Sequence, residues 1–552
     1  MLVALLFAGL TAALAFPLSV RPAGHVMSAS PDTNLFMWTL AWDVHAFTHQ
    51  PLRIFDANIY YPLRHTLAYS ENLIGSALVA APILWLTANP VLALNLVSLL
   101  SAALCGLGAY VLGRQVGMGA GGAIVCGIVY AFSPPRFLRL DQLHLATIQW
   151  VPFGLAALHA YLDGRQSRAL RFAALFFSLQ ALSSGHGVVF LTLSMLGLVV
   201  FRVALGEPIA PGQRLRDLGF TGALAVAPAI LVFVPYLMVQ REAGLRRTLE
   251  NWTVSASSFL ASPSHVHQWL LSLVPNARIN ETADAYLFPG FLPIALASVA
   301  LIRARDRRVV RFYALLTIVS VWLTLGPPIG IWPLVYWLPG LNFIRVPSRF
   351  MLLAILGLAV LAGFGAEITK TAGHEDTKAR KHIFLRVFVP SWLPLLLLFE
   401  FASFPLGLDP YVIEIPPIDR WLATRPKPFV VAEVPLPNPS DLGAWERRHT
   451  AFMLHSTAHW QKTVHGYSGL RLPLHVELYD ELTRFPDERS LASLERLGVT
   501  YVVVHTDWYR EGERLEIDRR FEPWRDRLRL VRAEGEGRVY AIVSGSARTG
   551  SR

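Results

Sequence analysis

Residues 1–42 read MLVALLFAGLTAALAFPLSVRPAGHVMSASPDTNLFMWTLAW, an apolar segment followed by a polar stretch with one early acid, Asp32. The first twenty residues lack the positively charged start and the small-residue cleavage site of a signal peptide. We therefore expect them to form a membrane-spanning helix. A long loop, 21–90, would follow on the outer side of the membrane.

The composition of the whole chain agrees with a membrane protein. Of its 552 residues, 53% are hydrophobic and only 16% are charged, whereas soluble proteins carry about 25% charge. An apolar segment of about 20 residues can cross a hydrocarbon layer of roughly 30 Å. The segment Leu73–Thr87 is short, so it is either another span or an interfacial helix. We expect about eleven transmembrane helices, near 1–20, 91–113, 119–135, 145–162, 170–184, 187–204, 217–237, 287–303, 311–326, 348–368 and 383–405.

Basic residues predict the topology. Lys and Arg concentrate in short loops at every second connection, as the positive-inside rule requires of cytoplasmic loops. These loops also account for the net charge of +11, so the sequence gives no reason to expect nucleic acid. Both cysteines lie in apolar segments, which excludes a disulfide framework. The basic loops are Arg114–Met118, Asp163–Arg171, Arg202–Arg216, Arg303–Arg311 and Lys370–Arg386.

The character of the chain changes after about residue 405. Phe429–Val434 and Thr500–Val504 have the apolar pattern of buried strands, and LASLERLGV (491–499) is typical of an amphipathic helix ending at Gly498. We expect residues 406–545 to form a soluble, extracytoplasmic α/β domain after a transmembrane domain at 1–405. Residues 546–552 are expected to be a disordered tail.

The first outer loop contains the main catalytic candidate, Asp32. It could act as a general base or a metal ligand at the membrane surface. Alternatively, it could be the N-cap of a helix beginning in PDTNLFMWTLAW, whose aromatic residues suggest a helix lying on the bilayer. Asp43 could support Asp32 or be an ordinary solvated carboxylate. Glu71 could be a cap or a loop acid.

Other outer segments supply polar candidates. Asp141 and His144 would share a helical face and could bind a sugar hydroxyl, a phosphate or a metal, or cap the next span. Arg345 and Arg349, in FIRVPSRF, lie on the side where arginine is disfavoured, which suggests a carrier phosphate; snorkelling to lipid phosphates is the alternative.

Three histidines complete the candidates. His186, in LSSGHG, is expected to be a packed structural histidine that could reach the outer site. His455 and His459 are four apart, a spacing compatible with a metal pair, although ordinary surface histidines are the favoured interpretation.

The layout resembles the GT-C superfamily of integral membrane glycosyltransferases, and more closely bacterial proteins of the YfhO-like type. The resemblance covers residues 1–405 and is carried by PDTNLFMWTLAW, IFDANIYYPLRHTLAYSENLIG, HLATIQWVPF, LFPGFLP and LPGLNFIRVPSRF, the last followed by a span ending in LAGFGA. It extends more loosely to GYSGL and LERLGVTYVVVH. By position, it implies catalysis by Asp32, a second acid at Asp141 and carrier phosphate near Arg345. The first loop lacks the adjacent acids common in that group.

These observations favour an inverting transferase that moves a sugar from a polyprenyl-phosphate donor to an extracytoplasmic glycan, lipid or protein. The expected location is a bacterial inner membrane, in contact with membrane lipids. A divalent metal is compatible with the candidates, but the sequence does not require one. The alternative is a non-catalytic transporter or scaffold for envelope polysaccharide assembly. Transporters usually have charged residues near the bilayer centre.

Overall fold

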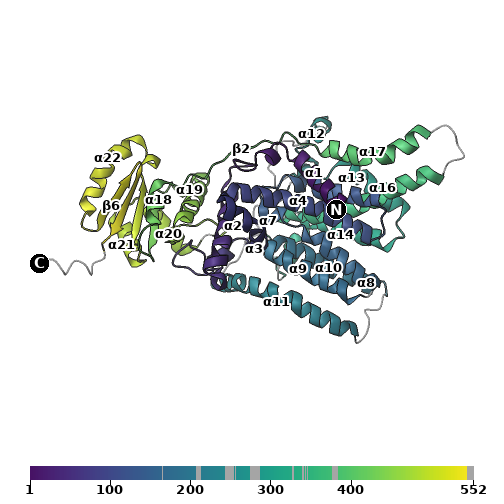
Figure 1. The fold of residues 1–552 in the computed structure, drawn as a ribbon, viewed down its shortest axis with the longest axis horizontal. Helices are drawn as coiled ribbons and strands as arrows, with labels where there is room; N and C mark the ends of the chain where they lie inside the picture. Colours follow the sequence, from purple (N-terminus) through teal and green to yellow (C-terminus); the bar gives the residue numbers. More distant parts are fainter. Residues whose placement is uncertain are drawn as a thin grey trace.

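The computed structural model shows a helical body joined to a smaller α/β unit at one end (Figure 1). The structure describes residues 1–164, 166–206, 213–242, 254, 256–273, 286–325, 329–338, 341, 344, 346–375, 383–470 and 472–543. Each of the eleven predicted spans coincides with a helix.

The longer helices of the body are α1 Leu2–Leu14, α2 Pro31–His49, α3 Ile74–Thr87, α4 Pro90–Gln115, α5 Ala120–Phe132, α8 Trp150–Gly164, α9 Ser167–Ser183, α10 Gly185–Ala204, α11 Gln213–Glu242, α13 Phe291–Arg303, α14 Arg308–Thr324, α16 Met351–Glu375 and α17 Ile383–Phe401. Short helices α6 Pro134–Phe137, α7 Leu143–Ala146, α12 His265–Leu271 and α15 Trp332–Val335 lie between them.

Four helical segments of the described chain are long and apolar enough to cross a membrane: Pro90–Gln115, Leu143–Gly164, Gly185–Ala204 and Pro347–Lys370. Other helices are apolar but shorter, among them α1 and α3. Helix α1 ends at Leu14 instead of residue 20, because Pro17 disfavours helical geometry in the residue before it. The predicted number of spans is therefore not confirmed, although the fold is that of a membrane protein.

Helix α16 lies at the centre of the body, packed against α5, α13 and α14. It approaches α13 closely at Gly365, where any side chain would collide with the carbonyl oxygen of Leu296. Small residues allow this kind of close packing between membrane helices, since their backbones can approach one another.

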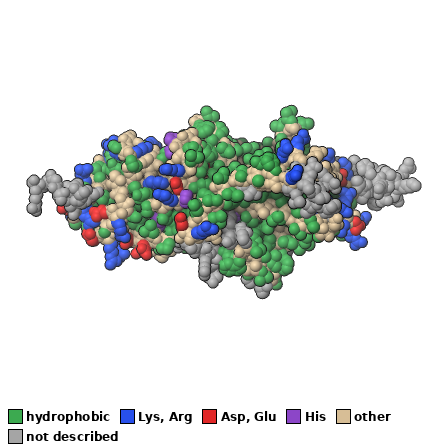
Figure 2. Space-filling view, turned by 90° about the horizontal axis from the view of Figure 1, so that it is seen from below, with side chains coloured by type: hydrophobic (Ala, Val, Ile, Leu, Met, Phe, Trp, Pro, Cys, Tyr) green, Lys and Arg blue, Asp and Glu red, His purple; other side chains and the backbone are tan. Residues whose placement is uncertain are grey.

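Figure 2 shows hydrophobic side chains covering the helical body on the face in view, with charged side chains gathered at the two ends. One of these ends is the C-terminal α/β unit, and the other carries mainly Lys and Arg. An apolar belt between two charged ends is the surface that a bilayer requires.

The α/β unit contains a five-stranded mixed sheet with the strand order β4-β3-β5-β7-β6. Strands β3 and β5 are parallel and mostly apolar, and both were predicted from the sequence. The elements are α18 Pro417–Leu422, β3 Val430–Val434, α19 Leu442–His455, β4 Lys462–Thr463, α20 Pro473–Leu482, α21 Glu488–Arg496, β5 Tyr501–His505, α22 Glu511–Phe521, β6 Leu528–Glu534 and β7 Gly537–Ile542. The expected tail at 546–552 lies outside the described residues.

Helix α2 connects the two parts of the molecule. Residues 35–44 are all buried, because α2 packs against α3 and α4 on one side and α19 on the other. The prediction that this aromatic segment lies on the bilayer is therefore wrong. A small antiparallel ladder, β1 His25–Val26 with β2 Asp409–Pro410, adds a second link.

Candidate active site on the outer loops

Asp32 lies in the first turn of α2, one residue inside the helix. The N-cap is Ser30, whose Oγ accepts a hydrogen bond from the Thr33 N–H at 3.2 Å. Pro31 occupies the first helical position, which suits proline because its fixed φ matches the helix and it needs no N–H partner there. The prediction that Asp32 caps this helix is therefore wrong, and its side chain is left to make other contacts.

The Asp32 carboxylate is instead bound by the C-terminal unit. Tyr467 donates its hydroxyl hydrogen to Asp32 Oδ1 at 2.9 Å, across 435 residues of sequence. Two further contacts fix this arrangement: Asn34 Nδ2 donates to Thr450 Oγ1 at 3.2 Å, and the Thr463 N–H donates to the Asn58 carbonyl at 2.7 Å. The C-terminal unit thus forms one side of the Asp32 environment.

Asp141 lies in the turn before α7, which begins only at Leu143. The expected helical face shared with His144 is therefore absent. Burial raises the pKa of Asp141 to about 6, and the negative charge of nearby Asp32 adds to the rise. The Arg139 guanidinium acts in the opposite direction. The structure thus brings the two predicted acids, Asp32 and Asp141, within electrostatic reach of each other.

His144 lies between Phe36 of α2 and a second group of polar residues. Its ring packs against Phe36, one helical turn beyond Asp32, with ring centroids 5.0 Å apart. On its other side it meets the edge of the His186 ring at 5.1 Å. His144 is buried and packs between α2 and the start of α10, and its role in binding stays a prediction.

His186 lies between an acid and an arginine. Its Nδ1 donates to Glu71 Oε1 at 2.6 Å, and its Nε2 accepts a hydrogen bond from Arg349 at 3.0 Å. Because Arg349 can only donate, the imidazole must be neutral with its hydrogen on Nδ1. The Gly185 N–H also donates to Glu71, at 2.7 Å. Glu71, His186 and Arg349 form a continuous hydrogen-bonded chain, which we call the Arg349 relay.

The sequence gives no indication that the relay residues contact one another. Glu71 was expected to be a cap or a loop acid, but it is buried and binds His186. His186 is packed, as predicted, and additionally orders Arg349. The only sequence signal was the helix break at LSSGHG, which exposes N–H groups that need acceptors. Arg345, the other predicted phosphate ligand, lies outside the described residues.

Asp43 is the clearest departure from expectation. It is 0% exposed, and within the described structure neither of its carboxylate oxygens has a hydrogen-bond partner. Burial raises the pKa of Asp43 well above its usual range. The prediction of a solvated carboxylate is therefore wrong. Eleven residues of helix separate Asp43 from Asp32, roughly 16 Å, so Asp43 does not contact the same site.

The predicted ligands do not fit a metal at this site. A divalent ion needs at least three ligand atoms converging on one point. Among the described residues, Asp32, Asp141 and His144 do not form such a group.

No protein-family profile matches this sequence, and no curated protein matches it. Solved structures do. The mycobacterial arabinofuranosyltransferase AftD aligns with 98% of this chain and 40% of its own, at 15% identity and a TM-score of 0.62. ArnT from Cupriavidus metallidurans bound to undecaprenyl phosphate aligns over 98% of both chains, at 13% identity and a TM-score of 0.48.

The Archaeoglobus fulgidus oligosaccharyltransferase aligns with 92% of this chain and 69% of its own, at 15% identity and a TM-score of 0.46. Sequence identities this low are evidence for a shared fold only. Of these three alignments, the one with AftD has the highest TM-score, and the comparison of folds rests on it. The chain shares its fold with AftD, and this agrees with the resemblance to GT-C membrane glycosyltransferases that the sequence indicated. The finer resemblance to YfhO-like proteins stays a prediction.

Proposed function

We propose that the protein is an inverting glycosyltransferase that uses a polyprenyl-phosphate sugar as donor and an extracytoplasmic glycan, lipid or protein as acceptor. The observation that supports this proposal most directly is that Asp141 lies within electrostatic reach of Asp32, while His144 joins the same helix α2 to His186 of the Arg349 relay. The C-terminal unit would face the periplasm of a bacterial inner membrane. The basic loops at the far end of the body would then be cytoplasmic.

Arg349 is the proposed ligand for the carrier phosphate. It is half-buried at the start of the α16 segment, where an arginine needs a reason to lie on the outer side. His186 accepts one of its hydrogen bonds and is itself fixed by Glu71. A guanidinium held in one orientation binds phosphate oxygens in a bidentate manner. Arg345 is proposed as a second phosphate ligand from the same FIRVPSRF segment.

Asp32 is the proposed general base. Its carboxylate would accept the proton from the acceptor hydroxyl while that oxygen attacks the anomeric carbon. The carrier phosphate would leave on the opposite face with the electrons of the C–O bond, so the sugar inverts. Tyr467 is proposed to position the carboxylate, and Asp141 to bind the acceptor through its oxygen atoms. No nucleotide is needed, because the phosphate carrier is the leaving group.

The test uses purified full-length protein in detergent with a panel of polyprenyl-phosphate sugars. Mass spectrometry would follow the release of polyprenyl phosphate by wild type, Asp32→Asn and the surface control Asp480→Asn, whose side chain is 64% exposed. We expect release by wild type and by the control, and a loss of about 100-fold or more in Asp32→Asn.

Equal release by wild type and Asp32→Asn would remove Asp32 from the reaction while keeping the transferase. Release from no donor in the panel would favour the second function, a transporter or scaffold for envelope polysaccharide. Native mass spectrometry for a bound polyprenyl lipid would then distinguish a wrong donor panel from a protein that does not bind such lipids.

A further inference from the structure

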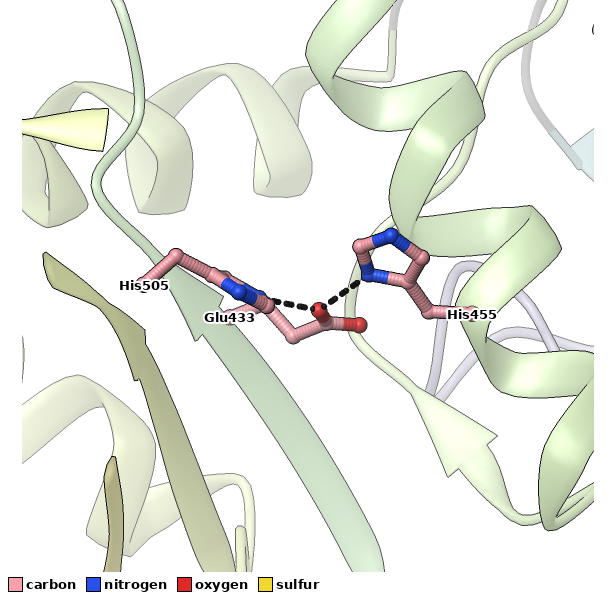
Figure 3. A group of neighbouring side chains, drawn as sticks. All are labelled: Glu433, His455 and His505. Atoms are coloured by element: carbon pink, nitrogen blue, oxygen red, sulfur yellow. Dashed lines mark hydrogen bonds and ion pairs between the residues drawn. The ribbon is translucent and has the colours of Figure 1, made fainter. Parts of the chain in front are cut away.

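The C-terminal unit contains a buried polar cluster that the outer site does not use. Glu433 extends from β3, His505 from the end of β5 and His455 from the end of α19 (Figure 3). Glu433 pairs with Val503 in the parallel ladder. Because alternate residues share one face of a sheet, Glu433 and His505 lie on the same face, the one on which Val431 and Val503 pack against α18.

A single carboxylate oxygen joins the two histidines. Glu433 Oε2 accepts from His455 Nδ1 at 3.0 Å and from His505 Nε2 at 2.8 Å. The three residues are no more than 5% exposed, and one ligand atom from each lies within 4.8 Å of the others. They are the only such group of three among the residues that the structure describes.

A second buried acid lies beside them. Asp419, from α18, is 0% exposed. Its Oδ2 is 3.9 Å from His455 Nδ1, and its Oδ1 is 4.0 Å from Nε2 of His459. Both distances are too long for hydrogen bonds. The expectation that His455 and His459 are surface histidines is therefore wrong, since both are buried.

Several of these atoms have no hydrogen-bond partner within the described structure: both carboxylate oxygens of Asp419, Glu433 Oε1 and His459 Nε2. A buried polar atom left without a hydrogen bond costs about 1–3 kcal/mol, so a fold rarely keeps several of them together without compensation. Two carboxylates side by side would also repel one another. A divalent cation would neutralise both and occupy the lone pairs that the protein leaves unused.

We propose that Asp419, Glu433, His455 and His505 form a structural zinc site. Tetrahedral zinc has bonds of about 2.0–2.2 Å to nitrogen and oxygen ligands, so its ligand atoms lie about 3.4 Å apart. The separations of 2.8 and 3.0 Å between Glu433 Oε2 and the two imidazole nitrogens are close to that spacing. Asp419 Oδ2 lies 3.9 Å from His455 Nδ1, outside the group of three, and would move toward the ion to become the fourth ligand. Two imidazoles and two carboxylates in a closed core suit zinc better than calcium or magnesium, which prefer oxygen ligands and water.

The ion would join α18, α19, β3 and β5 at the side of the sheet nearest the outer loop. Helix α19 packs against α2, and Thr450 of α19 accepts the hydrogen bond from Asn34. Zinc would therefore fix the helix that fastens the C-terminal unit to the segment carrying Asp32. This role does not depend on the proposed transferase activity.

The test measures zinc in the purified full-length chain after dialysis against a weak chelator. Inductively coupled plasma mass spectrometry should find about one zinc per wild-type chain, as expected for one closed four-ligand site. EDTA should lower the thermal unfolding temperature and added zinc should restore it. His505→Gln and Glu433→Gln should lose the ion, whereas His475→Gln should retain it. His475 is the matched control, because it is a buried histidine of the same unit outside the ligand set.

Replacement by Co²⁺ keeps the proposal testable if a variant fails to fold. Wild-type protein loaded with Co²⁺ should show the strong visible bands of tetrahedral cobalt. Absence of both zinc and these bands in wild type would overturn the proposal. Equal zinc retention by wild type and by folded His505→Gln and Glu433→Gln variants would also overturn it, because the metal would then be adventitious.

Discussion

Replacing Glu71 by Gln tests whether the Arg349 relay works as a unit. Glu71 and His186 have side chains only 7% and 5% exposed. The carboxylate accepts hydrogen bonds from His186 Nδ1 and from the Gly185 N–H, at 2.6 and 2.7 Å. Gln offers one acceptor oxygen, so one of these donors would face an N–H₂ group instead.

The magnitude follows from these contacts. A hydrogen bond to a charged group contributes about 1.5–3 kcal/mol, and a buried donor left unsatisfied costs about 1–3 kcal/mol. The substitution also removes the negative charge at the end of the chain that orients Arg349. We expect Glu71→Gln to lower the free energy of unfolding by about 3 kcal/mol and to reduce donor cleavage.

A double-mutant cycle isolates the coupling. Unfolding by SDS titration in mixed micelles would be measured for wild type, Glu71→Gln, Arg349→Gln and the double variant. We expect a coupling energy of about 1–3 kcal/mol, because removing both charges leaves less uncompensated charge than removing one. Donor cleavage should stay low in the double variant, since Arg349 itself would be missing.

The matched control is Asp163 with Arg202, another acid–arginine pair joined by a hydrogen bond. Its carboxylate is 46% exposed, so its coupling should stay below about 1 kcal/mol. Relay variants whose effects add to within about 0.5 kcal/mol would refute the reasoning, because Glu71 and Arg349 would then act independently.

Three further predictions concern the outer site. Burial raises the pKa of Asp141 from 3.8 to about 6, so the folded protein holds this proton more tightly than the unfolded chain. Stability should therefore fall by about 3 kcal/mol as the pH rises from 4 through 6. Unfolding at pH 4 and pH 7 should show a smaller loss in Asp141→Asn, and an unchanged loss would contradict the assignment. Tyr467→Phe removes the hydroxyl bonded to Asp32 and should reduce kcat/KM about tenfold, roughly 1.4 kcal/mol, in donor-release assays of a normally folded protein; full activity would exclude a positioning role. Ser30→Ala removes the N-cap of α2 and should cost about 1 kcal/mol of stability, whereas Ser30→Asn, which keeps a capping oxygen, should cost little; equal losses in both would show that the cap is not the cause.

Local patterns gave much of the architecture. Hydrophobic segments of helical length can be recognised in the sequence, because the side chains of each segment decide whether it is buried in lipid or protein. All eleven predicted spans are helices, and the strands at 430–434 and 501–505 lie where their apolar runs predicted them. Asp32 could be selected in the same way, because it is an acid that follows the first apolar segment.

Other expectations failed where a residue's surroundings come from distant parts of the chain. The cap expected at Asp32 lies two residues earlier, at Ser30, because Pro31 occupies the first position of the helix. Asp43, His455 and His459 are polar residues of a kind that is usually exposed on a helix. In the folded protein other parts of the chain bury all three. Sequence spacing cannot reveal such coverage, because it depends on elements far away in the chain.

The sequence by itself determined a helical membrane body, its apolar segments and the loops in which the catalytic candidates lie. Only the tertiary structure decided which polar side chains meet. Glu71 binds His186 across 115 residues, Tyr467 reaches Asp32 across 435, and Glu433 joins His455 and His505 inside the sheet domain. The spacing of hydrophobic residues indicates which face of each segment is buried. A hydrogen bond between distant residues forms only when folding brings their two segments together.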